Sequence, residues 1–230
     1  MKKYLLMALL LSSAAIFADP AQQPTSHVGD LSYTLGYQTG KALKAQSITV
    51  DTALFTKGIA DGYQNHPSAI PEKNMQTALS NMQQEVTAHM QQKQTELSEK
   101  NQQAGQLFLT ANAKKPGVIT TPSGLEYQIL NAGSGVSPTA NDTVTVNYEG
   151  SLIDGSVFDS SYQRGQPATF KVGDVIPGWQ EALQLMKAGD TWMLYIPAKL
   201  AYGNTGSPGA IGPNETLVFK VNLISVQKHA

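Results

Sequence analysis

Apolar residues recur at helical spacing in the first third of the chain. The spacing predicts an amphipathic helix over residues 30–45, with Tyr33 and Tyr37 one turn apart. A second helix is predicted to begin after Asp51, a favourable N-cap residue, and to end near Gly62. The apolar positions of the two helices are Leu31, Leu35, Ala42 and Leu43, then Leu54, Phe55, Ile59 and Ala60.

Two helices of this size cannot bury a sufficient hydrophobic core on their own, so their apolar faces need a partner surface. One alternative is that they pack on the C-terminal domain of the same chain. The other is that they pair with a second copy of the chain. We favour the homodimer, because the segment that follows carries these helices away from that domain.

A long Gln-rich segment comes next, and its apolar pattern changes part-way along. Residues 71–113 are predicted to form one helix with Pro71 at its first position, about 40 residues and roughly 60 Å long. Its first half keeps an apolar stripe of Met75, Leu79, Met82 and Val86. Beyond Met90 the stripe thins to Leu97, which weakens a coiled coil along the whole length and favours a solvent-exposed spacer. Bending is expected near Gly105 or within residues 114–117.

The last part of the chain alternates short apolar runs with turn signals. Strands are predicted at residues 125–130, 143–149, 191–196 and 217–226. Asp154-Gly155 is a hairpin signal, and a short helix is predicted at residues 179–186. The expected fold is α+β: a C-terminal antiparallel β-sheet domain with one short packed helix, preceded by an all-α region and a long spacer helix.

The N-terminus has the pattern of a secretory signal peptide. Lys2 and Lys3 precede a short apolar run, residues 4–11, and small residues follow up to Ala18. This run is well short of the ~20 residues that a transmembrane helix needs, which disfavours the alternative of a membrane anchor. We expect cleavage after Ala18, with Ala15 as the alternative. Two of the 16 basic residues would then be lost while the 17 acidic residues remain, so the formal net charge changes from −1 to −3.

The composition excludes several classes of site. The 230 residues include no Cys, so the chain can form no disulfide of its own and no Cys-containing zinc site. The four histidines are scattered without ligand spacing, and we expect no metal and no cofactor: His27, His66, His89 and His229. A basic stripe is missing, which argues against nucleic-acid binding. Export without Cys fits a periplasmic protein that folds without oxidants.

The richest set of candidate site residues lies between Tyr148 and Phe219. Aromatic and aliphatic residues recur there with one acid, Asp159, among them: Tyr148, Phe158, Val175, Ile176, Trp179, Tyr202 and Phe219. By composition alone these residues can all be plain core, and Arg164 can pair with Asp159 structurally. The alternative is a ligand cavity lined by aromatics with few polar groups. Such a site is too poor in polar groups for hydrolysis, but it can hold and twist an amide.

These motifs resemble, in the same order, those of the FK506-binding type of peptidyl-prolyl cis/trans isomerase (FKBP). The matching residues are Tyr148, Phe158-Asp159-Ser160-Ser161, Val175-Ile176-Pro177-Gly178-Trp179, Ala201-Tyr202-Gly203, Pro208-Gly209 and Phe219. Upstream, residues 32–37 and 54–62 resemble the dimerisation region of the macrophage infectivity potentiator (Mip) branch of that family. The implied organisation is a signal peptide (1–18), a helical dimerisation region (19–70), a connecting helix (71–115) and an isomerase domain (116–230).

The resemblance implies a role for each cavity residue. Trp179 would lie under the prolyl ring, while the Ile176 backbone N–H and the Tyr202 hydroxyl would donate to substrate carbonyls. Asp159 would orient or stabilise the twisted amide. The expected catalytic residues are therefore Asp159, Tyr202 and Trp179, and the expected substrate-binding residues are Tyr148, Phe158, Phe170, Val175, Ile176, Ile211 and Phe219. Ala168 and Ser207 stand where other members often carry larger pocket side chains, so they bear on substrate preference and inhibitor affinity.

The implied activity is rotation about X–Pro bonds in exported proteins, with chaperone activity as a dimer. The implied partners are proline-containing polypeptides, a second copy of the chain through the N-terminal helices, and FK506- or rapamycin-like macrolides as inhibitors. One alternative is mainly a chaperone with incidental isomerase activity. Another is a structural or adhesive surface dimer, which the intact aromatic set argues against. The expected location is the periplasm, with association with the outer membrane or cell surface as a further alternative.

Overall fold

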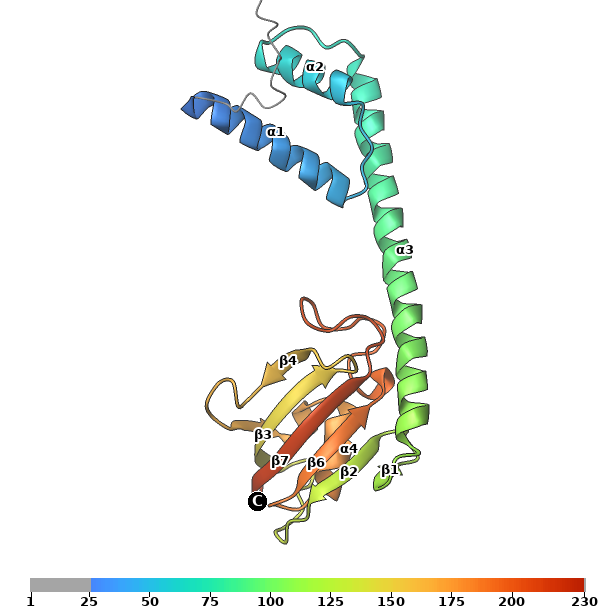
Figure 1. Ribbon diagram of the computed structural model, residues 1–230, viewed down its shortest axis with the longest axis vertical. Helices are drawn as coiled ribbons and strands as arrows, with labels where there is room; N and C mark the ends of the chain where they lie inside the picture. Colours follow the sequence, from blue (N-terminus) through green and yellow to red (C-terminus); the bar gives the residue numbers. More distant parts are fainter. Residues whose placement is uncertain (1–25, 230) are drawn as a thin grey trace, which may run out of the picture. The chain divides into compact units, whose positions relative to one another are not determined.

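The computed structural model describes residues 26–229, and the expected signal peptide therefore lies outside the described residues. The chain divides into two compact units between Val86 and Thr87. Helix α3 (Glu72–Asn112) begins in the first unit and ends in the second (Figure 1). The long helix expected from the sequence is confirmed. It starts one residue after Pro71, whose carbonyl accepts hydrogen bonds from the backbone of Asn74 and Met75.

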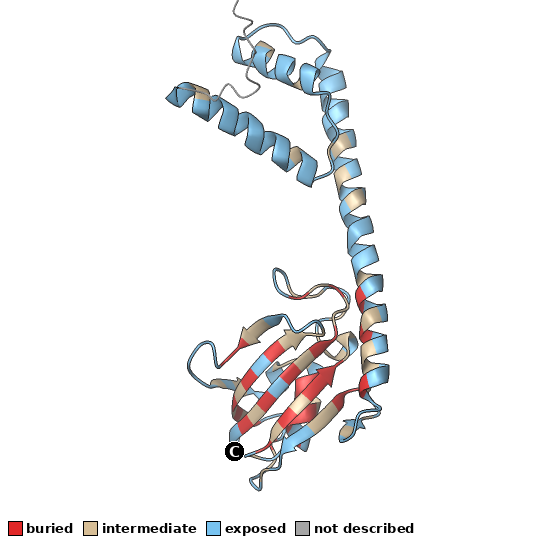
Figure 2. Ribbon diagram, viewed as in Figure 1, coloured by how far each residue is buried: buried red, intermediate tan, exposed pale blue. Residues whose placement is uncertain are grey.

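The first unit holds helices α1 (His27–Ala45) and α2 (Thr52–Tyr63) before α3. Helix α1 begins at His27 instead of Asp30 because the Ser26 hydroxyl caps it, accepting from the Gly29 N–H at 3.0 Å. Asp51 caps α2 as expected. Neither α1 nor α2 contains a buried residue (Figure 2). Both helices therefore form without any core of their own within one chain.

The second unit contains one antiparallel sheet, with seven strands among the residues described. The strand order is β1-β2-β6-β7-β3-β4, and β5 also pairs with β3 (Figure 1). The strands are β1 (Val118–Thr120), β2 (Glu126–Asn131), β3 (Thr143–Leu152), β4 (Val157–Ser160), β5 (Ala168–Lys171), β6 (Thr191–Ile196) and β7 (Leu217–Gln227). The hairpin at Asp154-Gly155 is confirmed, since Ser151 of β3 pairs with Val157 of β4. Strands β1 and β5 were not anticipated, because neither is longer than four residues, and β4 was anticipated only as the second arm of that hairpin.

Helix α4 (Pro177–Leu185) packs on this sheet and forms the core with it. The residues that it buries, together with the residue after it, follow the spacing of one helix face: Trp179, Ala182, Leu183 and Met186. Alternate residues of the central strands meet them: Val144, Val146 and Tyr148 of β3, and Leu217, Phe219, Val221 and Leu223 of β7. Gly178 permits close approach, because a Cβ there would lie 2.5 Å from Cγ2 of Ile196.

Within the second unit, the end of α3 packs against the segments around the sheet. Asn101, Gly105 and Asn112 are buried, and the Asn112 side-chain amide donates to Glu126 at 2.8 Å. A Cβ on Gly105 would lie 2.2 Å from Oγ1 of Thr216. The expectation of a solvent-exposed spacer is therefore wrong for this part of the helix. Buried side-chain amides and a glycine make most of this contact, and the ring of Phe108 adds one with Tyr195 at 6.0 Å between centroids.

These contacts predict that the end of α3 stabilises the sheet unit. A fragment of residues 87–230 keeps them, whereas a fragment of residues 117–230 leaves the buried Glu126 carboxyl without its amide donor. We expect the shorter fragment to melt on the order of 10 °C lower, because each buried polar group that loses its partner costs about 1–3 kcal/mol. Circular dichroism melts of the two fragments measure the difference. Equal melting temperatures would contradict a stabilising role.

Candidate functional site

A cavity of about 340 Å³ gathers residues from several elements of the second unit. Its lining consists of Tyr148, Phe158, Asp159, Phe170, Asp174, Val175, Ile176, Trp179, Tyr202 and Phe219. Nine of the ten residues expected at the site are in this lining. The tenth, Ile211, is buried in the core cluster and does not line the cavity. Asp174 lines it and was not anticipated.

Neighbouring strands and one short connection hold the lining residues in place. Tyr148 lies on β3, and β4 and β5, which both pair with β3, bring Phe158 and Phe170 beside it. Val175 and Ile176 lie between a 3-10 turn, η1 (Val172–Asp174), and α4. The side-chain amide of Gln180 fixes that connection by donating to the carbonyls of Gly173 at 3.0 Å and Val175 at 2.7 Å.

Trp179 lies at the centre of the aromatic contacts. Its ring centroid is 5.3 Å from that of Tyr148 and 5.2 Å from that of Phe219, with interplanar angles of 90° and 82°. Phe170 makes a third edge contact at 6.0 Å. Such edge-to-face pairs are the favoured geometry of aromatic rings. The indole is only 4% exposed, so the same ring belongs to the core and to the floor of the cavity.

Gly150 is a site residue that the sequence analysis missed. A Cβ at this position would lie 2.5 Å from Phe219 and 2.8 Å from Phe158. The two rings meet edge to face at 5.6 Å over the glycine. A glycine inside a strand is a signal for close approach, and this one precedes a hairpin.

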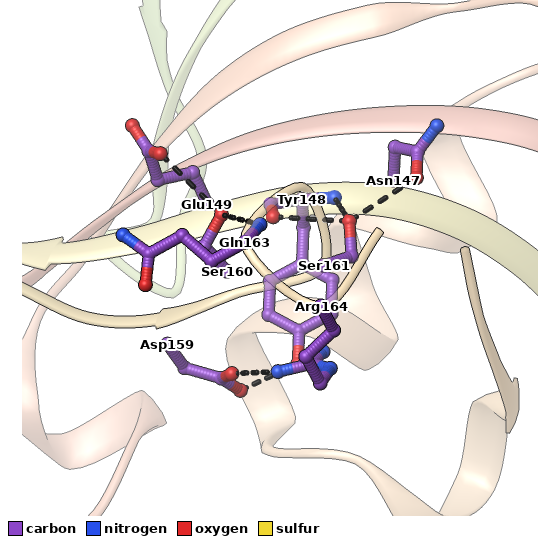
Figure 3. A network of polar contacts seen from close by, with 8 residues as sticks. All are labelled: Asn147, Tyr148, Glu149, Asp159, Ser160, Ser161, Gln163 and Arg164. Atoms are coloured by element: carbon purple, nitrogen blue, oxygen red, sulfur yellow. Dashed lines mark hydrogen bonds and ion pairs between the residues drawn. The ribbon is translucent and has the colours of Figure 1, made fainter. Parts of the chain in front are cut away.

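The side chains of Tyr148, Asp159 and Arg164 meet (Figure 3), and the first two of them line the cavity. Asp159 accepts hydrogen bonds from the Tyr148 hydroxyl and from Arg164, with which it also forms an ion pair. Arg164, the only arginine in the sequence, also donates to the Tyr148 hydroxyl at 2.8 Å. The pairing of Asp159 with Arg164 that the sequence left open is therefore present, and it lies within the cavity site.

These contacts determine the charge states of Asp159 and Tyr148. Partial burial raises the pKa of the Asp159 carboxyl, but the hydrogen bonds from Tyr148 and Arg164 and the charge of Arg164 outweigh it. The net pKa of Asp159 lies below its ordinary value of 3.8, so the group is a carboxylate at neutral pH. Burial and the hydrogen bond to Asp159 raise the pKa of Tyr148 above 10.0, so the phenol keeps its proton.

Backbone contacts hold the strand that carries Asp159 against β3. The Tyr148 N–H donates to the Ser161 hydroxyl at 2.8 Å, and the Ser161 N–H donates back to the Tyr148 carbonyl at 2.9 Å (Figure 3). Ser161 also reaches the side chain of Asn147 at 3.1 Å. Both serines of the Asp159-Ser160-Ser161 motif are buried. Ser161 therefore has a structural role, which is to fix Tyr148 and Asp159 relative to each other.

Three donors in the cavity lining are unused. No hydrogen bond within residues 26–229 occupies the Ile176 backbone N–H or the Tyr202 hydroxyl. The buried indole N–H of Trp179 likewise has no acceptor among the described residues. The lining contains neither His nor Ser nor Cys. The site can therefore donate hydrogen bonds and present a negative charge, and its lining offers no Ser–His or Cys–His pair.

Comparisons with known proteins agree with this geometry. The family described as FKBP-type peptidyl-prolyl cis-trans isomerase matches residues 135–224, and the domain amino terminal to it matches residues 29–129. The peptidyl-prolyl cis-trans isomerase Mip of Coxiella burnetii is 48% identical over 98% of this chain and 96% of its own. The chain belongs to the FKBP family.

Two further comparisons show to which group within the FKBP family the chain belongs. The outer membrane protein MIP of Legionella longbeachae is 47% identical over 96% of this chain and 95% of its own. The crystal structure of FkpA from Escherichia coli covers 88% of this chain and 98% of its own, with a TM-score of 0.76 and 37% identity. The protein is therefore an FKBP-type peptidyl-prolyl cis-trans isomerase of the Mip/FkpA group, as the sequence motifs predicted.

The Asp159 contacts predict how Arg164 controls the charge in this FKBP. Replacing Arg164 with Ala should raise the pKa of Asp159, because two lowering interactions are lost while burial remains. Arg164→Lys, which keeps the charge but not the two-armed geometry, should give an intermediate value. Carboxyl-carbon NMR titration measures both.

The lowered pKa of Asp159 also determines how its contribution to stability changes with pH. The folded pKa of Asp159 is lowered, so its stabilising contribution is present above the ordinary pKa of 3.8 and is lost as pH falls through the lowered value. In Arg164→Ala that acid-sensitive contribution should shrink. Identical titration curves for Asp159 in the native protein and in Arg164→Ala would show that Arg164 does not control this charge.

Proposed function

We propose that the aromatic cavity binds the prolyl residue of X–Pro bonds in exported polypeptides and favours the twisted form of the amide. The convergence of nine expected site residues on one largely apolar cavity, with the Asp159–Arg164 ion pair at its edge, supports this proposal most directly. Trp179 would lie under the prolyl ring, and the rings of Tyr148, Phe158, Phe170 and Phe219 would form the walls.

The chemistry follows from the properties of the amide. The C–N bond has partial double-bond character and a rotational barrier of ~18–20 kcal/mol, so uncatalysed exchange takes tens of seconds or longer. The twisted transition state loses amide resonance and is less polar than the planar ground state. An apolar cavity that excludes water therefore favours the twisted form, provided its shape fits that form.

The polar groups would orient the substrate. The Ile176 N–H and the Tyr202 hydroxyl are both unused donors of the lining, and they would bind substrate carbonyls on either side of the rotating bond. The fixed carboxylate of Asp159 would stabilise the altered charge distribution of the twisted amide. Rotation needs no proton transfer, so the donors only have to be placed correctly.

The roles of Tyr202 and Asp159 are testable with single variants. Tyr202→Phe should lower kcat/KM for a short prolyl peptide about fivefold, since one hydrogen bond is worth about 1 kcal/mol. Asp159→Leu should lower it about tenfold or more, because a fixed charge is lost. A protease-coupled assay measures the rates, with and without an FK506-like macrolide, which should compete for the cavity. Tyr162→Phe is the matched control, because that tyrosine is similarly exposed but outside the lining. Unchanged rates in both site variants would overturn the assigned roles.

We also propose that the first unit forms a homodimer. Large apolar side chains of its helices are exposed: Leu31, Leu35, Leu54, Ile59 and Leu79. An apolar hollow of about 380 Å³ between α2 and the start of α3 adds to this surface, with Leu54, Ile70 and Met75 in its lining. A two-fold pair would bury the same patch on both chains, and cyclic pairs are the commonest closed assembly. The name of the matching domain places it amino terminal to isomerase domains of this family.

Charge placed in that apolar face should separate the protomers. Leu35→Asp or Met82→Asp should give a monomer at micromolar concentration, because each buries an unpaired charge in the proposed interface. Gln84→Asp is the control, since residues two apart on a helix do not share a face. Light scattering after size exclusion gives the mass. A native monomer at micromolar concentration would contradict the proposal and favour helices that pack on their own chain.

A dimer would also support chaperone activity in the periplasm. Two linked cavities bind one long chain more tightly than either alone, because the second contact is intramolecular. An outer membrane location is suggested by the name of the Legionella longbeachae relative. No helix within residues 26–229 is long and apolar enough to cross a membrane. The export signal proposed from the sequence lies before these residues.

A further inference from the structure

The loop between η2 (Ala198–Leu200) and β7 forms one side of the prolyl site, with Tyr202 near its start. The backbone closes this loop across its base, because the Asn214 N–H donates to the Gly203 carbonyl at 2.8 Å. Near its tip, Ser207 and Ile211 exchange backbone hydrogen bonds of 2.8 and 3.0 Å. The Gly203 N–H also donates to the Ala198 carbonyl at 2.9 Å, so the backbone next to Tyr202 is held from η2 on one side and from Asn214 on the other.

Helix α3 holds the returning arm of that loop. The contacts pair Ser98 with Asn214, Asn101 with Pro213, and Gly105 with Thr216. The side-chain amide of Asn214 donates to the Ser98 hydroxyl at 2.8 Å, and that of Asn101 donates to the Pro213 carbonyl at 2.9 Å. Residues three and four apart share one helix face, so all three contacts come from the same side of α3.

These contacts fix the position of α3 along its axis relative to the loop. The Asn101–Pro213 bond is buried, so sliding the helix would leave an amide and a carbonyl without partners. Gly105 leaves no room for a longer side chain against Thr216. Asn214 has a φ of 53°, in the left-handed region that Asn tolerates. Its backbone binds Gly203 while its side chain binds Ser98, so one residue links the helix to the backbone next to Tyr202.

We propose that Ser98, Asn101 and Gly105 are positioning residues for the prolyl isomerase reaction, acting on Tyr202 through Asn214 and Gly203. The proposal rests on the function proposed above for Tyr202. Helix α3 is then part of the catalytic apparatus in addition to being a connection. Weakening the contacts between α3 and the loop displaces the Tyr202 hydroxyl. The aromatic walls stay in place, because they belong to β3, β4, β5, α4 and β7.

The test uses the full-length protein with three variants and one control. Asn101→Ala removes the donor to Pro213, and Gly105→Ala forces a methyl group against Thr216. Asn214→Gly keeps the left-handed backbone and loses only the bond to Ser98. Gln103→Ala is the control, because Gln103 is exposed and lies two residues from Asn101 on the same helix. We expect each of the three to lower kcat/KM for a short prolyl peptide severalfold, up to the loss in Tyr202→Phe, and the control to leave it unchanged.

A double variant separates positioning from general loss of stability. If Asn101 acts through Tyr202, Asn101→Ala combined with Tyr202→Phe should be no slower than Tyr202→Phe alone. The amide NMR signals of Tyr202 and Gly203 should shift in Asn101→Ala and stay unchanged in Gln103→Ala. Both readouts are compared at temperatures well below the melting point of every variant.

The outcomes are distinguishable. If Tyr202→Phe slows the reaction but Asn101→Ala and Gly105→Ala do not, the positioning role is wrong and the proposed function stands. The positioning role is also wrong if the two losses in kcat/KM multiply in the double variant and the amide signal of Gly203 does not shift. That combination indicates a merely structural effect of Asn101. If Tyr202→Phe itself leaves kcat/KM unchanged, the role of Tyr202 fails and this inference fails with it.

Discussion

The packing of the Trp179 ring between helix α4 and the sheet is the contact on which the catalytic unit depends. The ring meets Tyr148, Phe170 and Phe219 edge to face, and it is almost fully buried. Removing a buried aromatic ring of this size costs about 3–5 kcal/mol. Since the same ring is the floor of the cavity, the stability of the fold and the fit of the substrate both depend on Trp179. The enzyme therefore needs no separate scaffold beneath its site.

Polarity is confined to the edge of that aromatic set. The Asp159 carboxylate is held from two sides by Tyr148 and Arg164, so it is oriented before a substrate arrives. A fixed charge that does not have to reorient stabilises a changing charge distribution more effectively than mobile water. Ser161, two residues after Asp159, binds the backbone of Tyr148 through its hydroxyl and its N–H, which fixes the segment with the charge against β3. An apolar floor and a charged edge thus coexist without conflict.

The pattern of apolar residues predicted much of this structure, since periodicity records which side chains share a face. It predicted the strand at residues 217–226 and the short helix at residues 179–186, and the family resemblance predicted nine residues of the cavity lining. It missed Gly150, Asp174 and Gln180, whose roles come from partners brought close only by folding. It also missed the docked end of α3, where the buried residues are Asn and Gly and a single aromatic ring, Phe108, adds to the contact. Ile211 was also expected at the site, and it is buried in the core cluster without being part of the cavity lining.

The chain contains two tryptophans, and the fold gives them contrasting environments. Trp179 lines the cavity, whereas Trp192 is absent from that lining and is stacked on Tyr127 with ring centroids 4.3 Å apart and an interplanar angle of 9°. A bound prolyl ring would alter the surroundings of the first indole and leave the second covered. The intrinsic fluorescence of the protein thus contains both a reporter of occupancy and an internal reference. Binding can be followed without attaching any dye, even for clients that are never turned over.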